Sequence, residues 1–389
     1  MHRNKQSFFW NQQAFFDTYW QRQPWHGKKQ LLVDHINIAA TDLDHLCQQE
    51  AVTTRMLTQQ NNTFSLRSPK WDVNDPSKRT LFIQEMDRWF PEVRDLYKYF
   101  PHYPRWRFDD IMGSYSTAGS CSSPHVDFYD VFILQVAGSK RWLIEKTKRN
   151  FEQCKGDALL PHTDLRIIKE VQDYDTYILE PGDILYVPTR FVHEATAIQD
   201  SFSYSIGLRS PRIKDMIAAI DPKEAQKINE DIRMEEDHIY IDNLSIPNRL
   251  LSHIHNWPRS IALPTAPTPL WFGKLATMPP DDMPQQAYLS DILLEDQEAL
   301  LSELERLDTA WTLDPACKIA IQERPNLDEI HLFIQGEHIA MPKQARAFIE
   351  QLIQMEPWTS SELKKYFTKL PWNQQLWTYL CVNDLMYKA

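Results

Sequence analysis

The middle of the chain, residues 105–212, alternates short apolar runs with turn residues. Residues 131–136 and 184–187 are almost wholly apolar and predict buried strands, whereas residues 202–207 alternate like a strand with one covered face. Residues 180–183 read Glu-Pro-Gly-Asp, which indicates a turn because proline fixes φ and glycine accepts a positive φ. Many short strands with such punctuation favour an antiparallel β-barrel or jelly roll, which closes or shields its sheet edges.

Helical periodicity appears on both sides of this strand-rich segment. Residues 42–51 and 81–99 have apolar side chains at helical spacing, so residues 1–90 are expected to mix helices with short strands. Residues 258–284 are rich in proline and predict a linker. Between the strand-rich segment and this linker, charged amphipathic helices are expected at residues 213–220, 222–233 and 248–254.

The last part of the chain predicts a small mixed module of its own. Thr359 and Glu362 form a capping-box pattern at the start of a helix. The other expected elements are helices over residues 291–307 and 344–355, and strands over residues 318–322 and 331–340. The chain is therefore expected to be an α+β protein with three parts, residues 1–212 (with the barrel at about 105–212), 213–270 and 271–389.

Composition and charge narrow the class of protein. The 389 residues suffice for two or three domains, and the five cysteines are odd in number and lack a CxxC pair. A disulfide framework or a zinc site is therefore not expected. The cysteines instead favour a protein of the reducing cytoplasm. We find no signal-peptide pattern and no apolar stretch near the roughly 20 residues that span a bilayer. The formal charge of -11 argues against general nucleic-acid binding and favours a basic protein partner, although acidity also serves solubility alone.

His125, Asp127 and His193 are the strongest candidates for chemistry. Residues i and i+2 of a strand project from the same face, so His125 and Asp127 can reach one metal ion. Two imidazoles and one carboxylate are the ligands of a non-haem Fe(II) site with open positions. An isolated His193 would more simply be a core histidine, but its place at the end of an apolar run beside such a pair favours a ligand. A second triplet, His162 to Asp164, lies in a loop-like segment with no convergent partner and serves as an internal control.

The same residues carry a family resemblance. The chain resembles the JmjC-type 2-oxoglutarate oxygenases of the cupin superfamily, and most of all the bacterial ribosomal oxygenases, which hydroxylate an arginine of the sixteenth large-subunit ribosomal protein. The resemblance covers residues 8–212 well and the remainder in outline. It is carried by His125-x-Asp127, by Lys140 and by residues 16–24, 106–112, 179–194 and 203–211.

The resemblance implies a cosubstrate site next to the metal. In the family, 2-oxoglutarate chelates Fe(II) and reacts with O₂, yielding succinate, CO₂ and a hydroxylated substrate. Its far carboxylate needs a cation, and Lys140 matches that position, although a solvated lysine in a turn is the alternative. Bacterial relatives carry arginine there, so the charge is retained without the planar fork. Ser114, Ser116 and Ser203 are further candidates for hydrogen bonds to the cosubstrate, each with a purely structural alternative.

A substrate-binding set follows from the same resemblance. In the arginyl hydroxylases an Asp, an aromatic residue, a Met and a Ser hold the guanidinium. The matching positions here are Asp110, Tyr129, Met112 and Ser205. A carboxylate and an aromatic face both attract a planar cation. Ordinary core packing is the alternative for Tyr129 and Met112, and Asp109 could replace Asp110.

The flanking regions have expected roles as well. The family resemblance implies a dimerisation region in residues 213–270 and a winged-helix-like module in residues 271–389. That module holds ten Lys and Arg against eighteen Asp and Glu. Because a module this acidic would repel the phosphate backbone, direct DNA binding is not expected. We expect the module to contact protein instead.

Three functions remain to be compared. The first is a dioxygenase that hydroxylates an arginine of a large-subunit ribosomal protein. The second is a 2-oxoglutarate oxygenase that acts on a histidine, a methylated lysine or another protein. The third is a non-enzymatic binding protein built on a relic cupin, against which the intact His125, Asp127, His193 and Lys140 argue.

Overall fold

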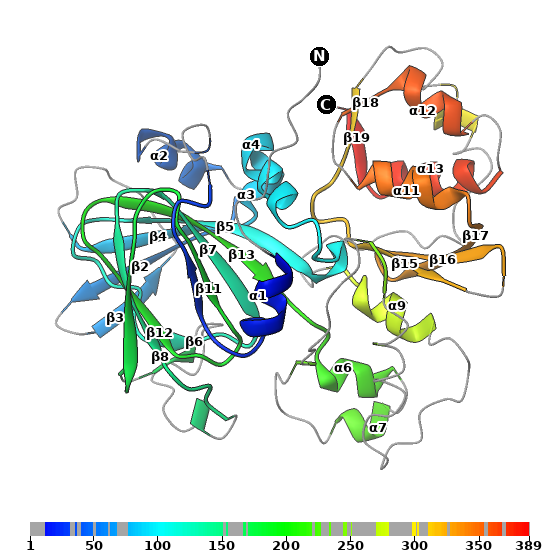
Figure 1. Ribbon diagram of the computed structural model, residues 1–389. Coiled ribbons are helices and arrows are strands. Elements are labelled where there is room, and N and C mark those ends of the chain that lie inside the picture. The colour runs from blue at the N-terminus through cyan, green and yellow to red at the C-terminus, as the bar shows by residue number, and fades with distance from the viewer. Residues whose placement is uncertain are drawn as a thin grey trace. The chain divides into compact units, whose positions relative to one another are not determined.

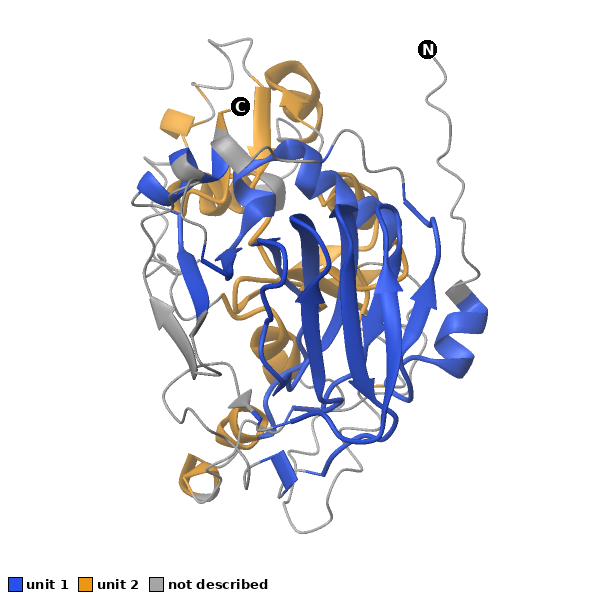
Figure 2. Ribbon diagram, turned by 90° about the vertical axis from the view of Figure 1, so that its left-hand side faces the viewer, with its two compact units in different colours: residues 1–100, 108–213, 229–239 blue, residues 101–107, 214–228, 240–389 orange. Residues whose placement is uncertain are grey.

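The computed structural model divides into two compact units (Figures 1 and 2). The first comprises Met1–Phe100, Phe108–Ile213 and Asn229–Ile239, and the second comprises Pro101–Arg107, Lys214–Ile228 and Tyr240–Ala389. The structure describes residues 12–31, 36, 40–49, 52–60, 63–67, 77–150, 153–154, 166–168, 170–219, 222–226, 233–234, 244–246, 250, 270–279, 298–300, 302, 310–324, 327–353, 357–367 and 371–388.

Two antiparallel sheets form the first unit. The larger sheet has the strand order β1 (Trp25–Gly27), β11 (Ile184–Val187), β7 (Asp130–Ala137), β13 (Ser201–Leu208), β5 (Phe108–Ser116), β4 (Arg79–Ile83), β2 (Thr54–Gln60) and β3 (Thr63–Arg67). The smaller sheet has the order β10 (Tyr174–Leu179), β8 (Lys140–Glu145), β12 (His193–Ala197), β6 (His125–Val126) and β9 (Arg166–Ile167). These sheets and the helices around them confirm the expected mixed α/β content with antiparallel sheets.

Strand β7 shows why its sequence is almost wholly apolar. Val131 and Ile133 belong to a buried cluster that also contains Trp142 of the smaller sheet, so they join the two sheets. On the opposite face, the Phe132 ring lies 5.6 Å from that of Phe15, measured between centroids. Phe15 belongs to helix α1 (Gln12–Thr18), which therefore covers this side of the sheet. Since both faces are covered, apolar residues are favourable at every position of the strand.

The N-terminal part of the first unit contains both helices and strands, as expected. Helix α2 (Ala40–Gln48) matches the expected helix. Strands β1 to β4 join the larger sheet, so that sheet extends beyond residues 105–212.

The helix expected over residues 81–99 is wrong at its start. Residues Arg79–Ile83 form β4, because they pair with β2 on one side and β5 on the other, which outweighs the local helical periodicity. Three short helices follow, α3 (Met86–Trp89), α4 (Pro91–Arg94) and the 3₁₀ helix η1 (Asp95–Tyr99). Phe90 is extended and Pro91 begins α4, so the chain cannot form one continuous helix here.

The region after residue 212 is only partly described. Helices α6 (Ile213–Ala218) and α7 (Pro222–Ala225) lie where helices were expected. The second does not reach Arg233, because Arg233 forms an antiparallel bridge with Arg212 and donates a hydrogen bond from its guanidinium to the Ser210 carbonyl (2.9 Å). Of the helix expected over residues 248–254 only residue 250 is described, and the control triplet at residues 162–164 lies outside the described residues.

The linker expected over residues 258–284 contains a helix, α9 (Leu270–Ala276), which corrects that expectation. Phe272 and Ala276 are buried, and the Phe272 ring lies 6.1 Å from that of Trp106 in the 3₁₀ helix η2 (Arg105–Arg107). At Gly273 an added Cβ would lie 2.4 Å from the ring of Phe333, so glycine is what lets the helix approach this closely. Tertiary packing therefore stabilises a helix in a proline-rich segment.

The second unit continues with two three-stranded sheets and three helices among its described residues. One sheet has the order β18 (Trp358–Thr359), β14 (Ala310–Leu313) and β19 (Met386–Lys388), and the other β15 (Ile319–Glu323), β16 (Glu329–Ile334) and β17 (Glu337–Pro342). The helices are α11 (Ala345–Leu352), α12 (Ser360–Phe367) and α13 (Pro371–Val382). These elements match the strands expected at residues 318–322 and 331–340 and the helix expected over residues 344–355. Of the helix expected over residues 291–307, the structure describes residues 298–300 and 302, which are helical.

The capping box at the start of α12 is confirmed by both of its hydrogen bonds. The amide N–H of Glu362 donates to the Thr359 hydroxyl (3.2 Å), and the amide N–H of Thr359 donates to the Glu362 carboxylate (2.9 Å). Among the described residues, no helix is both long and apolar enough to cross a membrane.

Candidate active site

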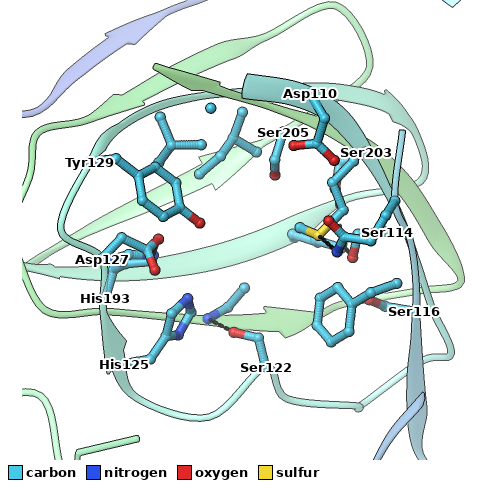
Figure 3. Close-up of a pocket in the computed structure, with 18 of the residues that line it drawn as sticks. Asp110, Ser114, Ser116, Ser122, His125, Asp127, Tyr129, His193, Ser203 and Ser205 are labelled. Carbon is cyan, nitrogen blue, oxygen red and sulfur yellow. Dashed lines mark hydrogen bonds and ion pairs between the residues drawn. The ribbon is translucent and has the colours of Figure 1, made fainter. Parts of the chain in front are cut away.

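A cavity of about 180 Å³ in the first unit brings all the candidate site residues together (Figure 3). Most lining residues on β5 and β13 are two positions apart, because side chains alternate between the two faces of a sheet. On β5 the lining residues include Asp110, Met112, Ser114 and Ser116, and on β13 they include Ser203, Ser205 and Gly207. The other candidates that line the cavity are His125, Asp127, Tyr129, Lys140 and His193.

His125, Asp127 and His193 form a cluster that can hold a metal ion. One potential ligand atom from each residue lies within 4.8 Å of the corresponding atoms of the other two. His125 and His193 are directly opposite one another on β6 and β12, and their ring centroids are 4.2 Å apart. Nε2 of His193 is 3.6 Å from Oδ2 of Asp127, which directly follows the end of β6. The cross-strand register therefore creates this cluster from residues 66 and 68 positions apart.

Backbone carbonyls orient both imidazoles. Nδ1 of His125 is 2.9 Å from the Ser123 carbonyl, and Nδ1 of His193 is 2.9 Å from the Phe191 carbonyl. With Nδ1 of each ring as the donor, Nε2 keeps a lone pair for a metal. Burial and the neighbouring His125 lower the pKa of His193 to about 4, so His193 is neutral at physiological pH. Two imidazoles and one carboxylate fit a divalent metal with open coordination positions.

Local backbone geometry supports this cluster. Ser123 has a φ of 63°, in the left-handed region, and its carbonyl is the one that Nδ1 of His125 contacts. Arg190, with a φ of 65°, donates its amide N–H to the Asp127 carbonyl at 2.8 Å. These two unusual residues tie the segments that carry His125 and Asp127 to the chain before His193.

Lys140 is a buried cation without a carboxylate partner among the described residues. Its side chain is 3% exposed, and its ammonium donates to the hydroxyls of Ser203 (3.0 Å) and Ser114 (3.2 Å). Burial lowers the pKa of Lys140 to about 7. A charged group in so dry a site is costly unless an anion neutralises it. The alternative of a solvated lysine in a turn is therefore inconsistent with the structure.

The three candidate serines differ in their contacts. Ser114 and Ser203 face each other across β5 and β13, and both accept a hydrogen bond from Lys140. Ser116 also lines the cavity, but its hydroxyl lies 3.1 Å from that of Thr80. Ser114 and Ser203 are thus part of the lysine site, whereas Ser116 belongs to a separate hydroxyl pair.

Asp110 presents a carboxyl group to the cavity from β5. Oδ2 of Asp110 accepts the amide N–H of Glu85 at 3.0 Å, and the nearby charge of Arg209 favours the ionised form of Asp110. Burial, and next the nearby carboxylates of Asp109 and Asp87, raise the pKa of Asp110 well above its usual range. A bound cation would relieve this repulsion. Figure 3 shows Asp110 and Tyr129 on opposite sides of the cavity, with their oxygen atoms turned toward its interior.

Met112 and Ser205 lie beside Asp110 in the sheet. They are a directly opposed pair on β5 and β13. The side-chain amide of Gln84 donates to the sulfur of Met112 at 3.1 Å, which restrains an otherwise flexible side chain. Gln84 lines the cavity and was not expected from the sequence, since it directly follows a strand that reads there as a helix.

Arg209 is the most important lining residue that the sequence did not single out. Its guanidinium carbon lies 5.1 Å from the centroid of the Tyr129 ring, and its Nε lies 2.8 Å from Oδ2 of Asp109. The aromatic face expected to receive a substrate cation therefore already contacts a cation of this chain. Alternation along β13 could have revealed Arg209, because it continues the series Ser203, Ser205 and Gly207 by two more residues.

Comparisons with known proteins agree with this geometry. Residues 95–216 match the JmjC domain. The ribosomal protein uL16 3-hydroxylase of Escherichia coli (strain K12) is 30% identical over 207 residues, which are 52% of this chain and 54% of that protein. The probable ribosomal oxygenase of Haemophilus influenzae is 31% identical over 214 residues, which are 54% of this chain and 52% of that protein. The chain thus spans about half the length of the curated relatives it matches.

Solved structures agree with the fold over nearly the whole chain. The structure of YcfD, a ribosomal oxygenase from Escherichia coli in complex with cobalt and 2-oxoglutarate, superposes with a TM-score of 0.66 at 20% identity. The match covers 98% of this chain and 99% of that one. At 20% identity this similarity shows a shared fold and nothing more.

Proposed function

Because residues 95–216 of this chain carry a JmjC domain, we propose that the protein is an Fe(II)- and 2-oxoglutarate-dependent dioxygenase. Its proposed substrate is an arginine side chain of a large-subunit ribosomal protein, the sixteenth, uL16. The observation that carries the proposal is the pairing, in one cavity, of a three-residue metal cluster with a buried lysine that has no described carboxylate partner. An enzyme that uses a metal and an anionic cosubstrate needs ligands for the metal and a cation for the cosubstrate.

His125, Asp127 and His193 are proposed to hold the metal. Their donor set fits Fe(II), which, when bound, would supply the redox chemistry that couples decarboxylation of 2-oxoglutarate by O₂ to hydroxylation of a substrate C–H bond. The carbonyls of Ser123 and Phe191 keep the two imidazoles turned toward the metal position. This orientation makes the site preorganised, since neither ring has to rotate before the metal binds.

Lys140 is proposed to bind the far carboxylate of 2-oxoglutarate. An ammonium within a buried pocket gives that carboxylate a strong charge-assisted hydrogen bond. The hydroxyls of Ser114 and Ser203, which accept from Lys140, keep the ammonium directed into the cavity. Carboxylate binding favours the protonated form of Lys140 and so returns the lowered pKa toward its ordinary range.

Asp110, Met112 and Ser205 are proposed to bind the substrate guanidinium. Asp110 has an oxygen available to a planar cation, and Met112 and Ser205 lie next to it on the paired strands. A neutral or anionic side chain would leave this carboxylate without a partner in an enclosed pocket, which disfavours its binding. Tyr129 keeps its proton, because burial and Asp127 raise its pKa, and its hydroxyl can donate a hydrogen bond within the cavity.

The flanking parts have proposed roles in assembly. We propose that residues 213–257 mediate a homodimer, since the apolar positions in the sequence of this segment are too many for one small region to bury alone. The second unit is proposed to include a winged-helix-like module that contacts protein rather than DNA, in agreement with its acidic charge. A ribosomal substrate places the proposed site of action in the cytoplasm.

Mass spectrometry of whole ribosomes tests the proposed activity. A strain that lacks this gene should lose a mass of about 16 Da, one oxygen, from uL16, and the purified enzyme should restore that mass on an arginyl peptide. Asp110→Asn should keep metal and 2-oxoglutarate binding but weaken hydroxylation of that peptide, because the substrate loses its charged partner. Oxidation of a histidyl peptide instead would overturn the substrate assignment and keep the oxygenase. A protein that releases no succinate with any of these peptides would be a binding protein.

A further inference from the structure

Arg209 occupies a position in the cavity that resembles the one proposed for the substrate. Like a bound substrate arginine, it combines an aromatic face with a carboxylate: its guanidinium carbon is 5.1 Å from the Tyr129 ring centroid, and its Nε is 2.8 Å from Asp109. Both contacts are of the kind that recognise planar cations. The cavity therefore offers two neighbouring places for a guanidinium, and a residue of the chain itself fills one of them.

Asp109 and Asp110 differ in their contact with Arg209. Asp109 forms an ion pair with Arg209. Asp110 accepts one amide N–H from Glu85, and the charge of Arg209 lowers its pKa less than burial and the carboxylates of Asp109 and Asp87 raise it. A guest guanidinium at Asp110 would favour the ionised form of that carboxyl group, whose pKa is raised, while a guest at Asp109 would have to displace Arg209.

Backbone geometry keeps the two places close to each other. Asp109 and Asp110 are consecutive on β5 and both line the cavity, where the pairing of β5 with β13 shifts register between Ile206 and Leu208. A Cβ added at Gly207 would lie 3.5 Å from Cβ of Asp109 and 3.7 Å from the Tyr129 ring, so Gly207 lies against both partners of Arg209. Arg209 follows Gly207 by two residues and reaches the same partners from the end of β13.

We infer that Arg209 is a specificity-determining positioning residue, which blocks the Tyr129–Asp109 place so that a substrate guanidinium binds at Asp110. This inference rests on the proposed arginyl substrate. The Arg209 side chain is 42% exposed, so its ion pair with Asp109 is partly screened by solvent, and its effect is on where the substrate binds rather than on how tightly. Without Arg209, a substrate could bind at either place, and at the Asp109 place its reactive carbon would lie in the wrong position relative to the metal ligands.

Arg209→Ala tests this inference through a split between KM and kcat. With an arginyl peptide of uL16, the variant should keep KM within a few-fold of wild type, since the carboxyl groups of Asp109 and Asp110 both remain. Its kcat should fall roughly 10- to 100-fold, the cost of a misplacement of about 1 Å. The ratio of succinate released to peptide hydroxylated should rise, because turnover of 2-oxoglutarate no longer coincides with a correctly placed C–H bond.

Free guanidinium chloride at low millimolar concentration gives a second readout. In the wild type it should inhibit, because it competes with the peptide at Asp110. In Arg209→Ala it should raise kcat and lower the succinate-to-product ratio, because it refills the vacant place against Tyr129. Arg209→Lys, which retains the charge without the planar group, should lie between the two. A merely structural role of Arg209 would not produce this change of sign.

Arg141→Ala is the matched control for Arg209→Ala. Arg141 is exposed on β8 one position from Lys140, so its side chain points away from the cavity, and Arg141→Ala should leave kcat, KM and coupling unchanged. If Arg209→Ala and Arg209→Lys both match the wild type, or if guanidinium inhibits Arg209→Ala as it does the wild type, the inference is overturned. A wild-type enzyme that does not hydroxylate the arginyl peptide would overturn the proposed function itself, a result that the variants cannot mimic.

Discussion

Replacement of Lys140 by methionine should weaken cosubstrate binding and at the same time stabilise the cosubstrate-free protein. Methionine has a similar length and no charge, so Lys140→Met removes the ammonium and leaves the cavity filled. If the far carboxylate of 2-oxoglutarate binds there, it loses its partner in a buried site. Such a loss costs about 3–5 kcal/mol, which corresponds to a rise in KM of roughly 10²- to 4 × 10³-fold.

The gain in stability follows from the same burial. Burial lowers the pKa of Lys140 from 10.5 to about 7. The charged form of Lys140 therefore lowers the stability of the folded state by up to about 5 kcal/mol at low pH. Between pH 7 and 10.5 the unfolded chain binds more protons than the folded one, so the folded state becomes more stable as the pH rises. The cost of the buried charge is therefore full below pH 7 and disappears as the pH rises toward 10.5. Methionine avoids the cost but loses the hydrogen bonds to Ser114 and Ser203, each worth about 0.5–1.5 kcal/mol. A net stabilisation of roughly 2 kcal/mol is expected near neutral pH, and Tm rises by about 2–4 °C for each kcal/mol.

Two measurements check this prediction. Succinate release gives the KM for 2-oxoglutarate, and thermal melts with Fe(II) under anaerobic conditions give Tm with and without 2-oxoglutarate. The wild type should have the lower Tm without the cosubstrate and should gain stability when it is added, whereas the variant should not respond. In the wild type KM should also rise as the pH increases above 7, because Lys140 loses its proton, and the variant should lack this dependence.

Matched variants separate charge from packing. Lys140→Arg keeps the charge and should lose less affinity than Lys140→Met, while Arg141→Met, on the outward face of β8, should change neither KM nor Tm. The reasoning would be refuted by a KM for Lys140→Met equal to that of the wild type. A lower Tm of this variant in the absence of 2-oxoglutarate would refute the part that concerns burial.

Two further predictions concern the metal and the assembly. His125→Ala removes a ligand and should abolish metal-dependent 2-oxoglutarate turnover with little change in Tm, whereas His162→Ala in the control triplet should have little effect; near-normal turnover of His125→Ala would contradict the metal assignment. Light scattering should give the mass of a dimer at micromolar concentration, and a chain ended after Pro211 should be monomeric; a full chain that scatters as a monomer would disprove the role of residues 213–257.

Sequence patterns were sufficient wherever a few neighbouring residues decide the structure. The alternation of β13 and the apolar run of β7 predicted both strands, because side chains of a strand alternate between a covered and an open face. The capping box at Thr359 was predictable for the same reason, since its two hydrogen bonds join residues three positions apart. The spacing of His125 and Asp127 likewise predicted two ligands on one side of a strand end, before any partner was known.

Patterns failed where partners distant in the chain outweigh local preference. Residues 81–83 have helical periodicity but lie between β2 and β5, whose backbone groups need partners that only a strand supplies. Helix α9 forms in a proline-rich segment because Phe272 and Gly273 pack against side chains far away in sequence. Neither outcome can be read from the segment itself.

The sequence by itself determined which residues are candidates for the chemistry, because possible metal ligands and charged side chains are visible as residue types at a fixed spacing. Only the tertiary structure decided what surrounds them. The register of β12 against β6 and β8 sets His193 opposite His125, and burial leaves Lys140 with two hydroxyls and no described carboxylate. The end of β13 likewise sets Arg209 against Tyr129 and Asp109. These contacts join residues far apart in sequence, and their energies depend on burial and distance, which arise only when the two sheets have packed.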